Sequence, residues 1–211
     1  MPKLVVGISG ASGVIYGLRL IDYLSSLGGF EVYTIITENA IRVAEHECCS
    51  SEAFLKIVRS RCKEVFMGGD LTSPLSSTSA IHDFTSMIIA PCSLKTLASI
   101  ANSYQNDLLS RAASNFLRLR KPLVLVVRET PISTLDIVNM LKVSLAGAVI
   151  LPASPAFYSN PKDLKDVVDY IVGKILDVVG IENKLYIRWG STATLTQERR
   201  LCVQFFGQEC L

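Results

Sequence analysis

The chain has 211 residues, of which 49% are hydrophobic, and 21 Lys and Arg against 19 Asp and Glu give a net charge of +2. This length suits one α/β domain with a substantial core, and the near-neutral charge without basic runs argues against nucleic-acid binding. No apolar run approaches the ~18 residues that a membrane-spanning helix needs, and the N-terminus shows no signal-peptide pattern, so we expect a cytoplasmic protein.

The first element is a short apolar strand over Leu4–Ile8, followed by the small-residue turn 9–13 and an apolar helical pattern from Val14 to Leu24. Strand, glycine turn and helix open a nucleotide-binding βαβ unit, because glycine lets the backbone approach a phosphate and the helix N-terminus offers free N–H groups. The glycines lie three apart, which differs from the dinucleotide fingerprint G-x-G-x-x-G. A tight turn that binds nothing is the alternative.

Apolar strands and amphipathic helices then alternate along the chain, which predicts an α/β fold with a parallel sheet. Residues 66–81, rich in Gly, Ser and Thr, are expected to form an irregular loop that is either functional or a solvated linker. Further strands are expected over Glu31–Ile36, Ser86–Ala90, Pro122–Val127 and Ala148–Leu151. Further helices are expected over Asn39–Cys48, Ser51–Arg61, Leu97–Ala101, Asn106–Leu119, Leu135–Ala146 and Pro161–Val179.

Polar side chains follow four of these strands. They are Ser9 and Ser12, then Thr37, then Ser93 and Lys95, and finally Arg128 and Glu129. The carboxyl ends of parallel strands meet at one edge of a sheet, so these groups are expected to converge into a binding site. The charged pair Arg128–Glu129 is either a substrate clamp or a structural ion pair that closes the sheet edge.

The six cysteines form no CxxC pair and no zinc-ligand spacing. His46-Glu47-Cys48-Cys49 resembles a metal motif, but vicinal cysteines rarely hold one tetrahedral ion and no second ligand pair exists, so we expect no metal. Cys202 and Cys210 could pair in a source that tolerates disulfides, which the sequence leaves open.

Several separated motifs together resemble the flavin prenyltransferases of the UbiX type, over residues 3–190. They are Gly7-Ile8-Ser9-Gly10-Ala11-Ser12-Gly13, Pro91-Cys92-Ser93-Leu94-Lys95-Thr96-Leu97, Arg111-Ala112-Ala113, the segment Pro122–Pro131, Gly147-Ala148-Val149-Ile150-Leu151-Pro152 and Pro155-Ala156-Phe157-Tyr158. Each motif is weak evidence alone, whereas all of them in order are highly specific.

The resemblance implies a single-domain, three-layer αβα Rossmann-like fold with a mostly parallel sheet, here residues 1–190, followed by an unassigned tail over 191–211. It implies transfer of the dimethylallyl group of dimethylallyl monophosphate to N5 and C6 of reduced FMN without a metal. The product, prenylated FMN, would serve a UbiD-type decarboxylase. The family also implies a homo-oligomer, a dodecamer with flavin sites at subunit interfaces.

The same resemblance assigns residues to roles. FMN would be contacted by Gly10, Ala11, Ser12, Thr37, Ser93, Leu94, Lys95, Thr96 and Arg128. The prenyl substrate would be bound by Arg111, Arg128, Glu129, Tyr158 and Lys174. Catalytic roles would fall to Ser12, Glu47, Arg118 and Glu129, and Trp189 matches the family's C-terminal tryptophan.

Residue chemistry is compatible with this assignment. Arg128, Lys174 and Tyr158 can hold the charge of a departing phosphate, and Glu129 or that phosphate can accept the proton lost on ring closure. One alternative is a flavoprotein cysteine decarboxylase, although the turn at Pro91 lacks that group's Pro-x-x-Ala-Asn pattern and no histidine is well placed. Another alternative is a flavin carrier without catalysis of its own. Preference for monophosphate over pyrophosphate stays open.

Overall fold

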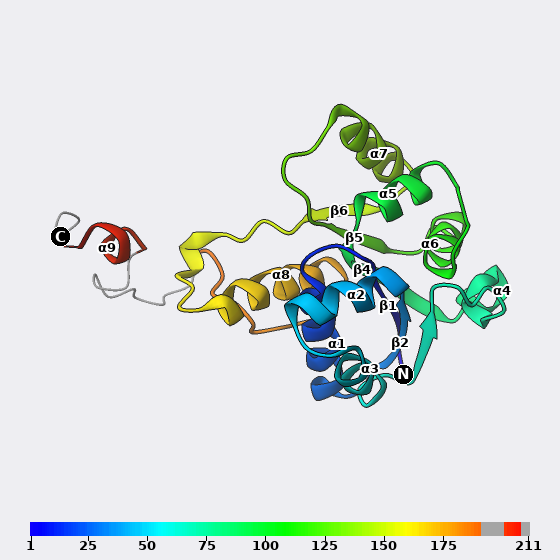
Figure 1. The fold of residues 1–211 in the computed structure, drawn as a ribbon, viewed down its shortest axis with the longest axis horizontal. Coiled ribbons are helices and arrows are strands. Elements are labelled where there is room, and N and C mark those ends of the chain that lie inside the picture. Colours follow the sequence, from blue (N-terminus) through cyan, green and yellow to red (C-terminus); the bar gives the residue numbers. More distant parts are fainter. Residues whose placement is uncertain (191–200, 208–211) are drawn as a thin grey trace. The chain divides into compact units, whose positions relative to one another are not determined.

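The computed structural model describes residues 1–190 and 201–207, and these form two compact units. The first, Met1–Ala153, holds the sheet, and the second begins at Ser154 (Figure 1). The strands are β1 (Lys3–Ile8), β2 (Glu31–Ile36), β3 (Glu64–Met67), β4 (Phe84–Cys92), β5 (Leu123–Val127) and β6 (Val149–Pro152). The helices of the first unit are α1 (Val14–Leu27), α2 (Glu38–Glu47), α3 (Ser51–Arg59), η1 (Pro74–Ser76), α4 (Thr78–Ile81), α5 (Leu94–Ala101), α6 (Leu108–Arg118) and α7 (Thr134–Leu145). The second unit contains η2 (Phe157–Ser159), α8 (Leu164–Val178) and α9 (Leu201–Phe206).

The sheet has the order β3-β2-β1-β4-β5-β6, and every neighbouring pair is parallel. The chain moves outward from β1 through β2 to β3, then returns to β4 beside β1 and moves outward in the opposite direction. Order therefore reverses between β1 and β4, and a crevice opens beyond their carboxyl ends. The expected Rossmann-like α/β fold is confirmed, with a sheet that is parallel throughout the described strands rather than mostly so.

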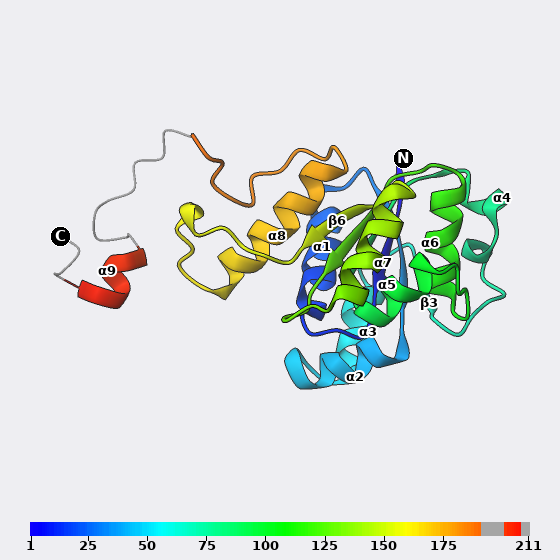
Figure 2. The same ribbon diagram turned by 90° about the horizontal axis from the view of Figure 1, so that it is seen from above.

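Helices cover both faces of this sheet. α1, α2 and α3 lie on one side and α5, α6 and α7 on the other, as Figures 1 and 2 both show. Crossovers of one hand that run in opposite directions from the centre must lie on opposite faces, which produces this arrangement. The three-layer expectation is confirmed.

The core explains why the central strands are continuous apolar runs. Val5, Ile35, Ile89 and Leu125 pack in one cluster with Leu97, Leu109, Phe116 and Val143 of α5 to α7. Their neighbours along the strands, Leu4, Val6, Ile88 and Val124, are equally buried. A strand that is covered by helices on both faces has no solvent side, so the sequence does not alternate.

Two segments differ from the sequence expectation. Residues 66–81 are not simply a loop, because Phe66 and Met67 belong to β3, which pairs with β2, and the rest includes η1 and α4. A four-residue edge strand depends on its pairing partner, which local sequence does not reveal. Similarly, the expected polar turn 91–96 is divided: Pro91 and Cys92 end β4, while Leu94 already lies in α5 because the Ser93 side chain caps that helix.

Other expectations are only partly addressed by the described residues. Among them, no helix combines the length and hydropathy that crossing a lipid bilayer requires. Within the same part of the chain, no three His, Cys, Asp or Glu gather as metal ligands. Cys210 lies outside the described residues, so whether it pairs with Cys202 stays open. A domain boundary at residue 190 stays a prediction; the compact units divide after Ala153.

Candidate functional site

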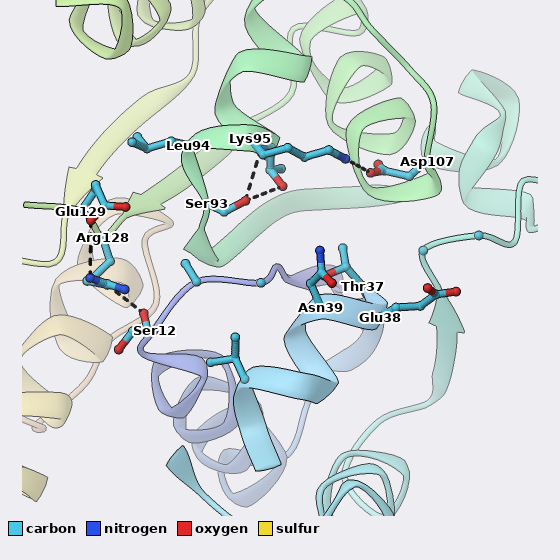
Figure 3. Close-up of a pocket in the computed structure, with 16 residues that line it drawn as sticks. Ser12, Thr37, Glu38, Asn39, Ser93, Leu94, Lys95, Asp107, Arg128 and Glu129 are labelled. Atoms are coloured by element: carbon cyan, nitrogen blue, oxygen red, sulfur yellow. Dashed lines mark hydrogen bonds and ion pairs between the residues drawn. The ribbon is translucent and has the colours of Figure 1, made fainter. Parts of the chain in front are cut away.

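Five strand ends, those of β1 to β5, meet around one cavity of about 660 Å³ at the crevice beside β1 and β4 (Figure 3). This volume lies in the range of small-molecule and cofactor sites. Its lining residues are Gly10, Ala11, Ser12, Thr37, Glu38, Asn39, Val43, Gly68, Gly69, Ser93, Leu94, Lys95, Thr96, Asp107, Arg128 and Glu129. The expected convergence of polar groups at the carboxyl ends of β1, β2, β4 and β5 is therefore what the structure has.

The turn after β1 is held close to its neighbours by glycine. A Cβ at Gly10 would overlap Asn39 at the start of α2, and Gly13 has a φ of 95°, which side chains rarely adopt. The Gly13 N–H, at the N-terminus of α1, donates to Glu47 Oε2 at 2.8 Å. A carboxylate of α2 thus holds the turn at Gly13, while Gly10, Ala11 and Ser12 of the same turn line the cavity.

Ser9 does not face the cavity, contrary to the expectation for that strand end. Its side chain is fully buried, donating to the Pro91 carbonyl at 2.8 Å and accepting from the Ser93 N–H at 2.7 Å. Ser9 therefore ties the turn after β1 to the turn after β4. Ser12 lies at the cavity, and its carbonyl accepts from Arg128 Nε at 3.1 Å.

Helix N-termini surround the cavity. Thr37 caps α2 by accepting from the Ala40 N–H at 3.2 Å, Ser93 caps α5 through the Thr96 N–H at 3.2 Å, and Asp107 caps α6 through the Ser110 N–H at 2.8 Å. All three capping residues line the cavity. The positive ends of three helix dipoles therefore point toward it, which favours an anionic ligand such as a phosphate group.

Four of the charged side chains at the cavity form two ion pairs. Lys95 Nζ lies 2.8 Å from Asp107 Oδ2, and Arg128 Nη1 lies 3.8 Å from Glu129 Oε1. Burial raises the pKa of Asp107, but Lys95 and the hydrogen bonds from Ser110 outweigh it and leave that pKa below its ordinary value. Asp107 is therefore an ionised partner that holds Lys95, while the less tightly paired Arg128 keeps guanidinium N–H groups available to a ligand.

The cysteine of the Pro91-Cys92-Ser93 motif carries no nucleophilic role here. Cys92 is fully buried at the end of β4, and burial raises the pKa of its thiol to about 12. A thiol that stays protonated at neutral pH is a poor nucleophile. Cys92 packs instead in the core cluster that includes Ile89 and Leu97.

Ten residues assigned by resemblance line the cavity together, and five others do not. Those in the lining are Gly10, Ala11, Ser12, Thr37, Ser93, Leu94, Lys95, Thr96, Arg128 and Glu129. Glu47 lies behind the turn at Gly13. Arg111 and Arg118 of α6 lie outside this cavity: Arg111 Nε donates to the Ser76 carbonyl at 3.0 Å, and Arg118 lines a smaller hollow of about 180 Å³ with Lys142.

Tyr158 and Lys174 belong to the second unit and lie in an aromatic group there. The Tyr158 ring packs edge-on against Trp189 with centroids 5.2 Å apart. Lys174 Nζ lies 5.8 Å from the centroid of the Tyr186 ring. Their assignment to the prenyl phosphate stays a prediction.

Sequence reasoning missed several lining residues: Glu38, Asn39, Val43, Gly68, Gly69 and Asp107. A usable signal existed for two groups. Glu38 and Asn39 directly follow the strand end at Thr37, and Gly68-Gly69 follow β3, so recognising that strand would have placed its carboxyl end at the same edge.

Comparison with known proteins gives a consistent picture. Residues 1–176 match the Flavoprotein family. The chain is 43% identical over 187 residues to the flavin prenyltransferase UbiX of Saccharolobus solfataricus, covering 89% of this chain and 92% of that protein. It is 41% identical over 191 residues to the UbiX of Aquifex aeolicus, covering 90% and 99% of the two chains.

Solved structures agree. AnUbiX (PadA1), crystallised with FMN and dimethylallyl pyrophosphate, superposes with a TM-score of 0.84 at 34% identity, over 90% of this chain and 98% of that chain. A dodecameric FMN-dependent UbiX-like decarboxylase from Escherichia coli O157:H7 also gives a TM-score of 0.84 at 34% identity, over 90% and 100%. The cysteine decarboxylase TvaF, at 13% identity and a TM-score of 0.62 over 85% of this chain and 99% of that chain, shares the fold alone.

Proposed function

The chain belongs to the Flavoprotein family and, within it, to the UbiX-type flavin prenyltransferases, and on that basis we propose that it transfers a dimethylallyl group from dimethylallyl monophosphate to reduced FMN. The observation that carries the proposal is the cavity at the β1–β4 crevice, where a glycine-serine turn, three capped helix N-termini and Arg128 meet. FMN is an anionic, planar ligand, and this lining offers donors for its phosphate and a small-residue wall for its ring.

The fit to FMN can be judged from the residues themselves. Gly10 and Ala11 present backbone rather than bulk, so a flat ring can approach closely. Helix dipoles at Thr37 and Ser93 favour negative charge. The Thr37 hydroxyl accepts from the Ala40 N–H and retains a proton to donate to a ligand, whereas the Ser93 hydroxyl already donates to Thr96 Oγ1 at 3.0 Å.

Prenyl transfer breaks the bond between the allylic carbon and the phosphate oxygen and, as we propose, forms bonds to N5 and C6 of the flavin. Arg128 would stabilise charge on the departing phosphate by a bidentate fork, together with Tyr158 and Lys174. Glu129, adjacent to Arg128, would accept the proton that ring closure releases, unless the phosphate does so. Reduced FMN supplies the nucleophile when bound, so the protein mainly positions two ligands.

A direct test is to incubate the protein anaerobically with reduced FMN and dimethylallyl monophosphate and to examine the flavin by mass spectrometry. We expect a flavin heavier by one prenyl group, and a parallel reaction with the pyrophosphate compares the two donors. Unchanged FMN in both reactions would contradict the proposal. Oxidative decarboxylation of a cysteine-containing peptide instead would favour the cysteine decarboxylase alternative.

The role of Glu129 is tested by the Glu129→Gln variant, which keeps the side-chain size and removes the base. We expect FMN affinity to stay near that of wild type and product formation to fall by about 10²–10⁴-fold, the usual contribution of a general base. FMN binding is measured by fluorescence titration and turnover by product mass. Full turnover in this variant would remove Glu129 from the mechanism and leave the phosphate as base.

We also propose that the protein is a homo-oligomer in which copies share sites. α7 exposes an apolar stripe, Leu135, Val138, Leu141 and Leu145, that would be unfavourable in water without a partner. Arg111 and Arg118 lie outside the cavity of their own chain, as expected if they serve a neighbouring copy. The dodecameric structural neighbour supports such an assembly.

Shared sites can be tested by complementation. Arg118→Ala and Glu129→Gln are each expected to be nearly inactive alone. Co-expressed hybrids would regain activity if Arg118 of one copy completes the cavity of another, because some hybrid sites would then contain both native residues. Hybrids as inactive as the parents would place Arg118 outside shared sites.

As recipient of the product we propose a UbiD-type decarboxylase, whose activation by the reaction mixture is the corresponding assay.

A further inference from the structure

The segment that follows α8 is attached to that helix through one carboxylate. We call residues 181–190 the strap. Asp177 Oδ1 accepts from Asn183 Nδ2 at 2.9 Å and from Arg188 Nη2 at 2.7 Å. Asp177 Oδ2 accepts from Arg188 Nη1 at 3.1 Å and from the Tyr186 hydroxyl. Three side chains of the strap therefore converge on a single residue of α8.

A second contact, one helical turn earlier, lets the strap lie close to α8. The Gly173 carbonyl accepts from Asn183 Nδ2 at 3.2 Å. A Cβ at Gly173 would lie 2.5 Å from Cδ1 of Tyr186 and 3.0 Å from Oδ1 of Asn183, closer than side chains tolerate. The absence of a side chain at Gly173 thus makes room for the ring and amide that reach Asp177.

The strap also carries Trp189, and aromatic contacts connect it to the attachment point. Trp189 packs edge-on against Tyr158, Tyr158 against Tyr170 with centroids 6.2 Å apart, and Tyr170 against Tyr186 with centroids 5.0 Å apart. Trp189 is nevertheless 80% exposed. The contact with Tyr158 therefore orients a Trp189 ring that is still accessible to a ligand.

Lys174 belongs to the same group. Its Nζ lies 4.0 Å from Asp177 Oδ2 and above the Tyr186 ring. Burial raises the pKa of Asp177, but the hydrogen bonds from Arg188, Tyr186 and Asn183 together lower it by more. The pKa of Asp177 therefore lies below its ordinary value. The ionised carboxylate therefore lies between two cations and offsets the repulsion that Lys174 and Arg188 would otherwise exert on each other.

We propose that Asp177 is a positioning residue for the prenyl phosphate that does not contact the substrate. By holding the strap on α8 it sets the places of Trp189 and of Tyr158, which packs against Trp189, and by its ion pair it sets the place of Lys174. The substrate part of this inference rests on the proposed function. The attachment itself rests on the contacts of Asp177 and Gly173 and can be tested without activity.

The attachment is tested with Asp177→Asn by limited proteolysis. Trypsin cleaves after Lys184 and Arg188, which lie in the strap, and mass spectrometry identifies each cleavage. We expect cleavage at these two sites to be faster by about tenfold or more in the variant, the factor that losing hydrogen bonds to a charged group corresponds to. Asp166→Asn is the control, because it also removes a carboxylate from α8. The Asp166 carboxylate accepts from the Lys162 N–H, which lies outside the strap.

The effect on the substrate is tested by kinetics and by binding. We expect Asp177→Asn to raise the half-saturating concentration of dimethylallyl monophosphate by about tenfold while FMN affinity stays unchanged, since the cofactor cavity is not altered. Trp189 is the single tryptophan of the chain, so quenching of its fluorescence by added dimethylallyl monophosphate reports binding directly. Asp166→Asn should resemble wild type in both measurements.

Tyr186→Phe tests the attachment and the positioning role if Asp177→Asn does not fold, because it keeps the ring and removes one donor to Asp177. A smaller shift in the same direction is expected, in cleavage and in half-saturation alike. Cleavage at the wild-type rate in the folded variants would overturn the attachment. Faster cleavage with unchanged half-saturation and unchanged Trp189 titration would make the strap purely structural and overturn the positioning role.

Failure of the proposed function looks different. If wild type forms no prenylated flavin, turnover cannot be compared between the two proteins. The affinities of wild type and Asp177→Asn for dimethylallyl monophosphate are then compared by the Trp189 titration. Equal binding, or no binding by either protein, would then overturn the positioning role, whereas weaker binding by the variant alone would support it.

Discussion

The rim of the cavity and the group around Asp177 are built in opposite ways. The rim consists of turns whose polar atoms are held by the backbone: Ser9 is buried between two turns, and Thr37 and Ser93 cap helices. The group around Asp177 consists of long side chains that meet at one carboxylate. Crowding should therefore damage the rim most, whereas loss of a single charge should damage the second group most.

Arg128 is the exception to this comparison, because it is a long charged side chain that belongs to the rim. Arg128→Ala should lower turnover by about 10²–10³-fold, since it removes a charge-stabilising donor from the departing phosphate. Arg128→Lys should recover only part of the rate, because an ammonium lacks the bidentate fork that also reaches the Ser12 carbonyl. Product mass measures turnover. Near-normal rates in Arg128→Ala would assign the phosphate to other residues.

The second prediction concerns crowding at the rim. Gly10→Ala should destabilise the protein by about 1–3 kcal/mol, because the added Cβ overlaps Asn39 and the turn must shift. Thermal unfolding without FMN measures this, and FMN titration should show weaker binding. Gly69→Ala is the matched control: it also lies in the lining, and a Cβ there meets no atom within 4 Å. Equal unfolding temperatures for both variants would show that the rim tolerates volume.

The smallest effect is expected from a charge in the rim. Asp107→Asn keeps a good helix cap but removes the partner of Lys95, and should cost about 1 kcal/mol at most at neutral pH because Lys95 remains largely in water. The pKa of Asp107 lies below its ordinary value of 3.8 in the folded protein, so its contribution is present above pH 4 and is lost as pH falls further.

Denaturant unfolding at pH 7 and near pH 3 measures this contribution. The difference between wild type and Asp107→Asn should shrink at the lower pH. Asp83→Asn, which removes an exposed carboxylate next to Lys3, serves as the control and should show little difference at pH 7. A difference that grows on acidification would mean that Asp107 is not ionised in the folded state.

Most of the rim could be predicted from the sequence. Apolar runs located the central strands, and parallel strands bring their carboxyl ends together, so Ser12, Thr37, Ser93 and Arg128 were expected at one place. The caps at the rim also have local signals, since Thr37, Ser93 and Asp107 each directly precede a helix and have a side-chain oxygen that caps it. What local sequence does not contain is direction: Ser9 and Ser12 lie in the same turn, yet one is buried against Pro91 and the other lies at the cavity.

The group around Asp177 could not be predicted in the same way. Tyr186 and Arg188 are separated from Asp177 by nine and eleven residues, and no periodic pattern links them. Gly173 lies inside a helix, where sequence reasoning treats glycine as a cost rather than as room for a neighbour. Similarly, β3 is only four residues long, and its existence depends on pairing with β2. Contacts of this kind are decided by packing.

The central place of β1 in the sheet has a consequence for synthesis of the chain. β1 can pair with β2 soon after both leave the ribosome, but its other edge waits for β4, where Val6 lies beside Ile88. At translation rates of about 5–20 residues per second, that edge stays open for roughly 4–16 s. During this interval an apolar strand with unpaired backbone groups is exposed to other nascent chains. Slower translation would lengthen this exposure, so yield in a host should depend on how quickly codons 9–92 are read.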